Sequence, residues 1–304
     1  MKNYIYTTFI IFFIGINIFG QSPNWTVNEN DYQYTMSYVI FANINGIELS
    51  STNDKVVAFV NGQVRGVTNL VYVASEDSYY AFLTVFANAN GETLRFKIYD
   101  SVNDKVLDID KTESFEINAI HGNLFQAFSL ANPELSKNVE IISFGFEGVS
   151  NNDYEKEGLQ ITIYLNKGQD VTSLNAIFTL NTGANLYKGT IKQISSENTL
   201  DFTNPIQFQV LSEDRSVIKQ WTVRVILGTG IVTYYKKDAV CYSRGAIKVL
   251  FTENSAEVEL YLNGIIYSKQ TINNGETTFV NLDVGTYKVK VGGNIKVFNI
   301  EQKL

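Results

Sequence analysis

The segment Leu159-Gln-Ile-Thr-Ile-Tyr-Leu165 carries an aliphatic residue at every second position. Because successive side chains of a β-strand point to opposite faces, this pattern predicts a strand with one buried face. The same alternation recurs in residues 32–40 and 94–98. Gly, Asn and Asp separate such runs, and no segment keeps a helical period over three turns. The sequence therefore predicts an all-β protein.

Two polar stretches, residues 131–138 and 228–238, divide the chain on either side of this segment. They leave predicted domains at 22–130, 139–227 and 238–304, which we expect to be three tandem antiparallel β-sandwiches. The middle domain has about seven short strands in about 90 residues, which is typical of an immunoglobulin-like sandwich. The last domain, of about 65 residues, is near the lower size limit for a fold stabilised by its core alone.

The start of the chain has the features of a signal peptide. Lys2 precedes an apolar run over residues 5–19, which ends at Gly20 and Gln21. Such a run is shorter than the roughly 20 apolar residues that span a bilayer. We therefore expect residues 1–20 to be a signal peptide that is cleaved between Gly20 and Gln21. The rest of the protein is expected to be secreted or held at the outer cell surface, and not to be integral to the membrane.

Composition argues against two classes of partner. The formal net charge is −7, with 24 Lys and Arg against 31 Asp and Glu, and the sequence has no basic stripe. Nucleic acid and anionic membrane surfaces both attract clustered Lys and Arg, so we expect neither as a partner. Hydrophobic residues make up 45% of the chain, which is enough for packed cores. Cys241 is the single cysteine, so no intrachain disulfide can form.

The first predicted domain contains a recognisable motif. Asp54-Lys-Val-Val-Ala-Phe59 is followed by Gly62-x-x-Arg65-Gly66, and both lie between Trp25-x-Val27 and Leu94-x-Phe96-Lys-Ile-Tyr99-Asp100. This D-x-x-x-A-F-x-x-G-x-x-R-G pattern resembles a module of secreted and cell-surface proteins of Bacteroidetes-type bacteria. The resemblance covers nearly the whole domain, and it implies no catalytic role.

The second predicted domain resembles the short Ig-like domains of Bacteroidetes surface and glycan-handling proteins. The residues that carry the resemblance are Asp201-Phe-Thr-Asn-Pro205, Phe208-x-Val210-x-Ser212-Glu-Asp214 and Trp221-x-Val223-x-Val225. The resemblance implies a spacer that holds a binding module away from the cell. Trp221 lies in an alternating strand, where Trp is usually a core residue, although a surface Trp could stack on a sugar.

The third predicted domain carries two resemblances that lead to different roles. Leu282-x-x-Gly285-x-Tyr287-x-Val289-x-Val291 resembles the C-terminal sorting domain that the type IX secretion system recognises, and this would make the type IX machinery a partner. Cys241-x-x-x-Gly245-Ala-Ile-Lys-Val249 resembles instead the small repeats of gliding-type surface adhesins. Asn263-Gly264 within this domain predicts a two-residue hairpin turn, because both residues of such a turn need positive φ.

Two groups of charged residues in the first domain are candidate sites. Asp54 and Arg65 could form a charged pair that borders a ligand groove, or a hairpin-closing salt bridge of roughly 0 to 1 kcal/mol. The carboxylates of Asp100, Asp104, Asp108 and Asp110 are candidate ligands for Ca²⁺, or else a solvated acidic edge. Their order lacks the D-x-D-x-D-G spacing of a calcium loop.

The hexapeptide at residues 51–56, Ser-Thr-Asn-Asp-Lys-Val, is echoed at residues 101–106 as Ser-Val-Asn-Asp-Lys-Val. The sequences diverge after each copy. We therefore predict two similar turns and no duplication.

No motif for catalysis is present. G-x-S-x-G, H-E-x-x-H and Walker-type loops are absent, and His121 is the single histidine. We therefore expect a non-catalytic adhesion or scaffold protein without a cofactor, calcium being the one candidate. The alternative is a carbohydrate-binding protein that captures extracellular polysaccharide. The partner would be an extracellular glycan or a surface protein, and a row of exposed Tyr or Trp on one sheet face would favour the glycan.

Overall fold

The computed structural model describes residues 22–149, 153–253 and 255–303, so the predicted signal peptide and its cleavage site at Gly20 and Gln21 lie outside the described residues. The prediction of an all-β fold is confirmed. The one helical element in these ranges is a 3-10 turn, η1 (Glu29–Asp31). None of the described residues form a helix that is long and apolar enough to cross a membrane. The chain divides into two compact units, Met1–Glu134 and Leu135–Leu304.

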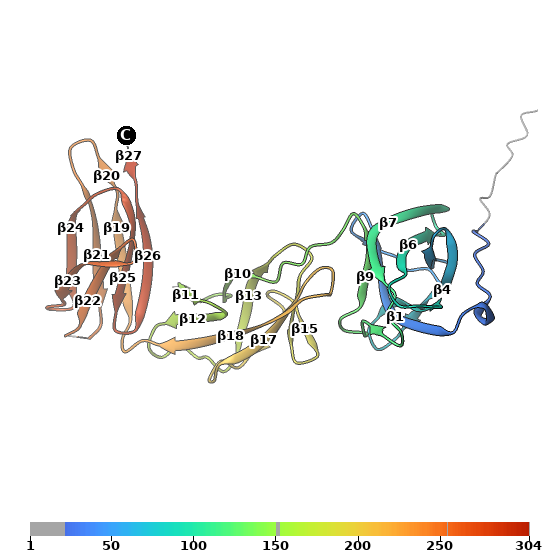
Figure 1. Cartoon of the computed structure of the whole chain (residues 1–304). Coiled ribbons are helices and arrows are strands. Elements are labelled where there is room, and N and C mark those ends of the chain that lie inside the picture. The colour runs from blue at the N-terminus through green and yellow to red at the C-terminus, as the bar shows by residue number, and fades with distance from the viewer. Residues whose placement is uncertain (1–21, 150–152, 254, 304) are drawn as a thin grey trace, which may run out of the picture. The chain divides into compact units, whose positions relative to one another are not determined.

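The first unit is built on a nine-stranded sheet that folds over on itself (Figure 1). The main strand order is β2-β1-β5-β4-β3-β6-β7. Its strands are β1 (Tyr34–Ile44), β2 (Ile47–Glu48), β3 (Lys55–Val60), β4 (Gln63–Val73), β5 (Ser78–Ala87), β6 (Thr93–Asp100), β7 (Lys105–Ser114), β8 (Ile120–His121) and β9 (Phe128–Asn132).

Strand β4 connects the two layers of this first sandwich. Its first half pairs with β3, and its second half pairs with β5 from Leu70 onward. Gly66 lies just before this change of partner, and a Cβ there would overlap the backbone carbonyl of Thr84 on β5. The Arg65-Gly66 end of the sequence motif is therefore needed where β4 passes closely over β5. Met36, Leu83 and Phe96 are among the buried residues of the core that lies between the layers.

The second unit contains two further hydrophobic cores, and the first of these lies in the central sandwich. A three-stranded sheet, β10-β13-β16, and a six-stranded sheet, β11-β12-β18-β17-β14-β15, enclose it. The strands are β10 (Ile141–Phe146), β11 (Tyr154–Glu157), β12 (Gln160–Leu165), β13 (Leu174–Leu180), β14 (Asn185–Lys188), β15 (Ile191–Gln193), β16 (Thr199–Leu200), β17 (Ile206–Leu211) and β18 (Ile218–Leu227).

Trp221 on β18 is a core residue, as its place in an alternating strand predicts. Its side chain is 0% exposed, and its indole N–H donates to the carbonyl of Val139 at 3.2 Å. The Lys156 ammonium lies 4.7 Å from the ring centroid. A buried ring of this kind is not available to stack on a sugar.

The last core belongs to the C-terminal sandwich. The sheets β19-β21-β24 and β23-β22-β25-β26 supply it, and β20 pairs with β27. The strands are β19 (Val232–Lys237), β20 (Ala239–Val240), β21 (Gly245–Phe251), β22 (Glu257–Leu262), β23 (Ile265–Thr271), β24 (Glu276–Leu282), β25 (Gly285–Val291), β26 (Asn294–Ile300) and β27 (Gln302–Lys303). The predicted hairpin at Asn263-Gly264 is confirmed, with φ values of 51° and 80°.

Two expectations differ from the structure. Residues 232–237, predicted as part of a polar bridge, form β19, whose Val232 is buried in the core while its lysines reach solvent. The sandwiches are also not purely antiparallel, because β9 pairs in parallel with β1, β12 with β18 and β20 with β27. Parallel pairs join strands that are distant in sequence, so the hairpin signals between neighbouring strands do not reveal them.

The central and C-terminal sandwiches contact each other within the second unit. Lys288 donates to Glu155 at 2.9 Å, and Lys296 donates to Asp153 at 3.1 Å. The other carboxylate oxygen of Asp153 accepts the backbone N–H of Val297 at 2.9 Å. Because the bonds to Asp153 and Glu155 come from two strands of the C-terminal sandwich, β25 and β26, they oppose bending at the junction. That residues 139–227 fold alone stays a prediction.

We expect the change Trp221→Ala to lower the free energy of unfolding of the second unit by about 3 to 5 kcal/mol, because it empties a large aromatic site in a core. Scanning calorimetry of the protein from Ser22 onward measures this loss. The control Ile191→Ala trims an exposed side chain on β15 and should change the same free energy by less than about 0.5 kcal/mol. A loss below about 1 kcal/mol for Trp221→Ala would contradict its core position.

Candidate functional site

The two similar hexapeptides meet at one end of the first sandwich. The first copy precedes β3 and the second follows β6, and these strands are antiparallel neighbours with Lys55 opposite Tyr99. The buried carboxylate of Asp54 accepts the backbone N–H of Ser51 at 3.0 Å and that of Ser101 at 2.8 Å. The Ser101 hydroxyl also donates to Asp54, at 2.6 Å. Asp54 therefore joins the two turns.

The candidate calcium ligands Asp100, Asp108 and Asp110 have separate roles. The carboxylate of Asp100 accepts the backbone N–H groups of Val102 and Asn103 in its own turn, at 3.0 and 3.1 Å. Asp108 is exposed and pairs with Lys97 at 2.9 Å, and Asp110 is exposed further along β7. In the described ranges, no group of three or more His, Cys, Asp or Glu side chains is placed to hold a metal ion. The structure does not bring the four carboxylates together.

The fourth of these carboxylates, Asp104, accepts the Tyr99 hydroxyl at 2.8 Å. This hydrogen bond raises the pKa of Tyr99, and burial and the charges of Asp54 and Asp100 add to the shift.

Arg65 is part of a different cluster. Its guanidinium donates to Glu92 at 2.7 Å and to the carbonyl of Phe86 at 3.2 Å, and it lies 4.5 Å from the ring centroid of Tyr32. Burial alone would raise the pKa of the Glu92 carboxyl. The backbone N–H groups of Asn88 and Ala89 and the Arg65 charge outweigh burial, so that the pKa of Glu92 is lowered.

The predicted pair of Asp54 and Arg65 is therefore not formed. Each side chain is buried and has its partners elsewhere in the sandwich, Asp54 in the joined turns and Arg65 in the cluster with Glu92. Sequence alone could not separate these roles, because both residues belong to one motif and their charges are opposite. In the structure, the motif positions Asp54, Arg65 and Gly66 hold the fold together.

A polar groove with a volume of about 470 Å³ lies beside the joined turns. Asn69, Lys55 and Tyr99 form one row across β4, β3 and β6, because Lys55 is the registered partner of both other residues. Asn69 is exposed and Lys55 is half-buried, whereas Tyr99 is buried at the inner side of the groove. Asn53 and Ser101 extend the row into the two turns. The residues that line the groove are Ser22, Asn53, Lys55, Asn69, Tyr99 and Ser101.

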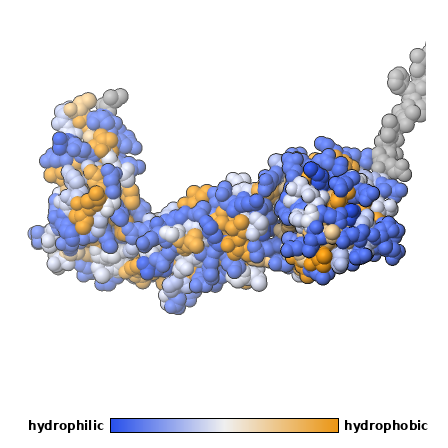
Figure 2. All heavy atoms as spheres, in the orientation of Figure 1, coloured by the Kyte–Doolittle hydropathy of each residue, from blue (hydrophilic) through white to orange (hydrophobic). Residues whose placement is uncertain are grey.

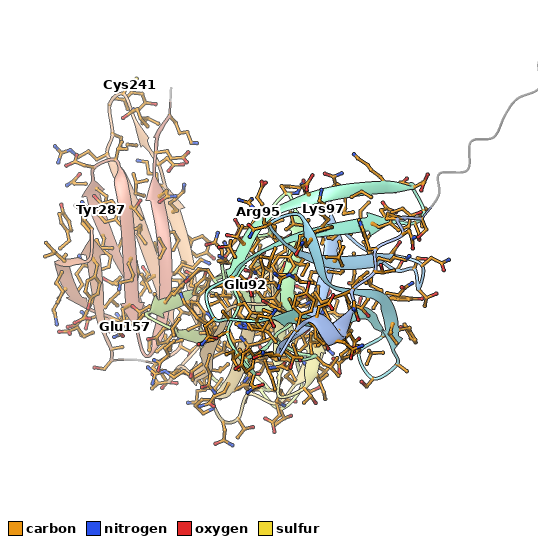
Figure 3. The ribbon with its side chains drawn as sticks, turned by 45° about the vertical axis from the view of Figure 1, so that its right-hand side comes forward. Glu92, Arg95, Lys97, Glu157, Cys241 and Tyr287 are labelled. Atoms are coloured by element: carbon orange, nitrogen blue, oxygen red, sulfur yellow. The ribbon has the colours of Figure 1, made fainter. Side chains whose placement is uncertain are left out.

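Aromatic and cationic side chains continue this surface along β3 and β6. Trp25 packs edge-on against Phe59 with ring centroids 6.1 Å apart, and Lys97 lies 5.7 Å from the Phe59 centroid. Arg95 is the registered partner of Phe59 and is exposed. Arg95 and Lys97 lie on the same strand, and Glu92 comes just before its start (Figure 3). We call the outward residues of β3 and β6 together with the polar groove the β3–β6 face.

Within the described residues, no single strand carries two exposed Tyr or Trp side chains in succession on one face. Across strands, the exposed Tyr72 of β4 is the registered partner of the half-buried Tyr79 of β5, with ring centroids 5.3 Å apart. The β3–β6 face offers instead the partly exposed pair of Trp25 and Phe59. The alternation at residues 94–98 does place Arg95 and Lys97 on the polar side of β6. Which residues lie beside Arg95 and Lys97 on the neighbouring strands depends on strand register. No pattern in the sequence indicates this register.

The single histidine and the single cysteine belong to different units of the chain. His121 stacks on Tyr38 with ring centroids 5.1 Å apart, and its Nε2 atom is buried without a hydrogen-bond partner in the described part of the chain. Cys241 is exposed in the second unit.

The central sandwich matches a known family model. Residues 141–225 match the model of the SGBP N-terminal domain, from the surface glycan-binding proteins of Bacteroidetes. That family consists of cell-surface, glycan-binding, non-catalytic proteins. The match agrees with the resemblance of this domain to Bacteroidetes surface proteins. No curated protein sequence matches the chain.

Several solved structures show a distant similarity to the chain. A Bacteroides thetaiotaomicron protein provisionally described as a glycoside hydrolase is 24% identical over 45% of this chain, with a TM-score of 0.27, and the chain spans 36% of its length. Extracellular domains 3–5 of Drosophila OTK are 8% identical over 92% of this chain and all of their own, with a TM-score of 0.17. The I9–I11 tandem of titin is 9% identical over 88% of this chain and 99% of its own, with a TM-score of 0.21.

We expect Glu92→Gln to destabilise the first unit by about 1 to 3 kcal/mol, because the buried Arg65 charge loses its partner. The pKa of Glu92 is lowered by folding, so its contribution is present above the ordinary carboxyl pKa and is lost as pH falls through the lowered value. The Glu92→Gln variant should therefore lack the part of the acid-induced loss of stability that comes from protonation of Glu92. Urea unfolding measured across acidic pH tests both points.

The matched control for this experiment is Asp108→Asn, which breaks the exposed pair with Lys97. Asp108 has 78% of its side chain exposed, so the change should cost no more than about 1 kcal/mol. Equal losses in the two variants would contradict the structural role given to the Glu92 and Arg65 pair.

Proposed function

We propose that this protein is a non-catalytic, cell-surface glycan-binding protein whose first sandwich contacts the glycan. The observation that carries the proposal is the registered row of Asn69, Lys55 and Tyr99 in the polar groove, next to Trp25 and Phe59. The match of residues 141–225 to a surface glycan-binding family supports the same conclusion.

The chemistry of the groove suits sugars. Sugar hydroxyls both donate and accept hydrogen bonds, and so do the amides of Asn53 and Asn69, although the Asn69 amide also donates to the carbonyl of Thr52 at 2.7 Å. The hydroxyl of Ser101 donates to Asp54, so it offers a sugar an acceptor. The ammonium of Lys55 adds a donor, although it also bonds to the carbonyl of Pro23 at 3.4 Å. Aromatic rings beside such groups offer an apolar face to the C–H side of a sugar ring. A site that binds sugars through such groups does not need a deep cavity. An open groove can hold an oligosaccharide chain.

An adhesion or scaffold role, which the sequence favours at first, predicts a different surface. Protein interfaces usually have an apolar centre with a polar rim. On the face visible in Figure 2, hydrophobic residues form separate patches among hydrophilic ones. The glycan-binding alternative therefore has the better support.

The second unit then serves as a spacer. Its two sandwiches are joined by the bonds of Asp153 and Glu155 to β25 and β26, which stiffen their junction. Whether the C-terminal sandwich also acts as a sorting domain or as an adhesin-type repeat stays a prediction, as do the signal peptide and a contact with the type IX machinery.

We expect the protein from Ser22 onward to bind oligosaccharides on a glycan array. Asn53→Ala and Asn69→Ala should each weaken binding by about tenfold in titration calorimetry, since each removes one or two hydrogen bonds to the sugar. The control Gln207→Ala removes an exposed amide from β17 of the central sandwich and should leave the affinity unchanged. An array without bound glycan, or equal affinities in all variants, would contradict the proposal.

A further inference from the structure

We propose that the glycan is anionic and that its carboxylate or sulfate group lies over Arg95 and Lys97. This inference rests on the proposed function and adds the class of ligand. It comes from the distribution of charge on the β3–β6 face, which opposes the charge of the whole chain.

The residues of β3 and β6 on this side of the sheet contain three cations and no acid. They are Lys55, Val57, Phe59, Arg95, Lys97 and Tyr99. Val57 and Tyr99 are buried, Lys55, Phe59 and Lys97 are half-buried, and Arg95 is exposed. The neighbouring β7 adds Asp108, which lies 2.9 Å from the Lys97 ammonium, and the exposed Asp110. In a chain with a formal net charge of −7, this excess of cations on two strands is a local feature. Such a surface favours an anionic ligand over a neutral one.

Arg95 is the residue best placed to bind the anion. It is exposed, and within the described residues its guanidinium forms no ion pair. A guanidinium can donate two parallel hydrogen bonds to a carboxylate or a sulfate group. Arg95 also lies opposite Phe59 in the sheet, so a sugar that stacks on the Phe59 ring would bring its charged substituent close to Arg95.

The acidic residues at the other end of the face set the direction of the ligand. Asp104 accepts the Tyr99 hydroxyl at 2.8 Å and Asp100 follows Tyr99 on β6, so two carboxylates offset the charge of Lys55 at this end of the face and make it less favourable for an anion. Lys97 lies two residues from Tyr99 on β6 and Arg95 lies four residues away, which corresponds to about 7 and 13 Å along an extended strand. The groove would then hold uncharged hydroxyls, and the anionic group would bind one or two rows further along. A ligand that reaches both places is an oligosaccharide.

The experiment compares matched pairs of ligands. A panel of uronate-bearing and sulfated oligosaccharides is titrated into the protein from Ser22 onward, each beside its carboxyl-reduced or desulfated form. We expect the anionic member to bind at least about tenfold more tightly at low salt, and the preference to shrink at about 200 mM NaCl, where exposed charges are screened. The uronate and sulfate arms identify which anion is bound.

The variant Arg95→Gln should remove most of the preference for the anionic form and leave the affinity for the neutral form unchanged. The control Lys192→Gln removes an exposed cation from β15 in the central sandwich and should alter neither affinity. Because Arg95 is exposed, thermal unfolding of the variant should match that of the unmodified protein.

Equal binding of the charged and neutral forms, with no effect of Arg95→Gln, would overturn the anionic proposal and leave the glycan-binding proposal intact. Binding of neither form would overturn both. A preference for the anionic form that survives in Arg95→Gln would overturn the assignment to this face.

Discussion

The carboxylate of Asp54 holds the two turns on which the polar groove depends. It accepts two backbone N–H groups and one hydroxyl from the two turns, although Asp54 and Ser101 are 47 residues apart in sequence. A buried carboxylate needs several such donors to offset the loss of water. Because these donors belong to both turns, the ends of β3 and β6 are fixed side by side. The positions of Asn53 and Ser101 in the groove follow from this joint.

The second constraint is the passage of β4 between the layers of the first sandwich. Gly66 permits the close approach to Thr84, and Arg65 then fixes the outer side through Glu92, Phe86 and Tyr32. The two ends of the motif therefore both hold the first sandwich together, at different places. Asp54 secures the turns, and the Arg65-Gly66 pair secures the crossing. The residues free to bind a ligand lie between these points, on the outer side of β3 and β6.

Local patterns in the sequence predict much of this fold. Alternation predicts the strand at residues 159–165 and the core position of Trp221, and Asn263-Gly264 predicts its hairpin, because these features depend on neighbouring residues. The row of Asn69, Lys55 and Tyr99 depends on the pairing of three strands, and no local pattern encodes it. For the same reason the sequence suggests a pair between Asp54 and Arg65, although each has another partner in the folded chain.

Chemical-shift mapping by NMR tests the central claim most directly, since it reports which residues a bound glycan touches. Isotope-labelled protein is titrated with an oligosaccharide that binds on the array, and the side-chain amide signals of Asn53 and Asn69 are followed. The account predicts that these signals and the backbone amide of Ser101 shift at the same ligand concentration, together with the indole N–H of Trp25. Shifts confined to the second unit, with these four signals unmoved, would contradict it.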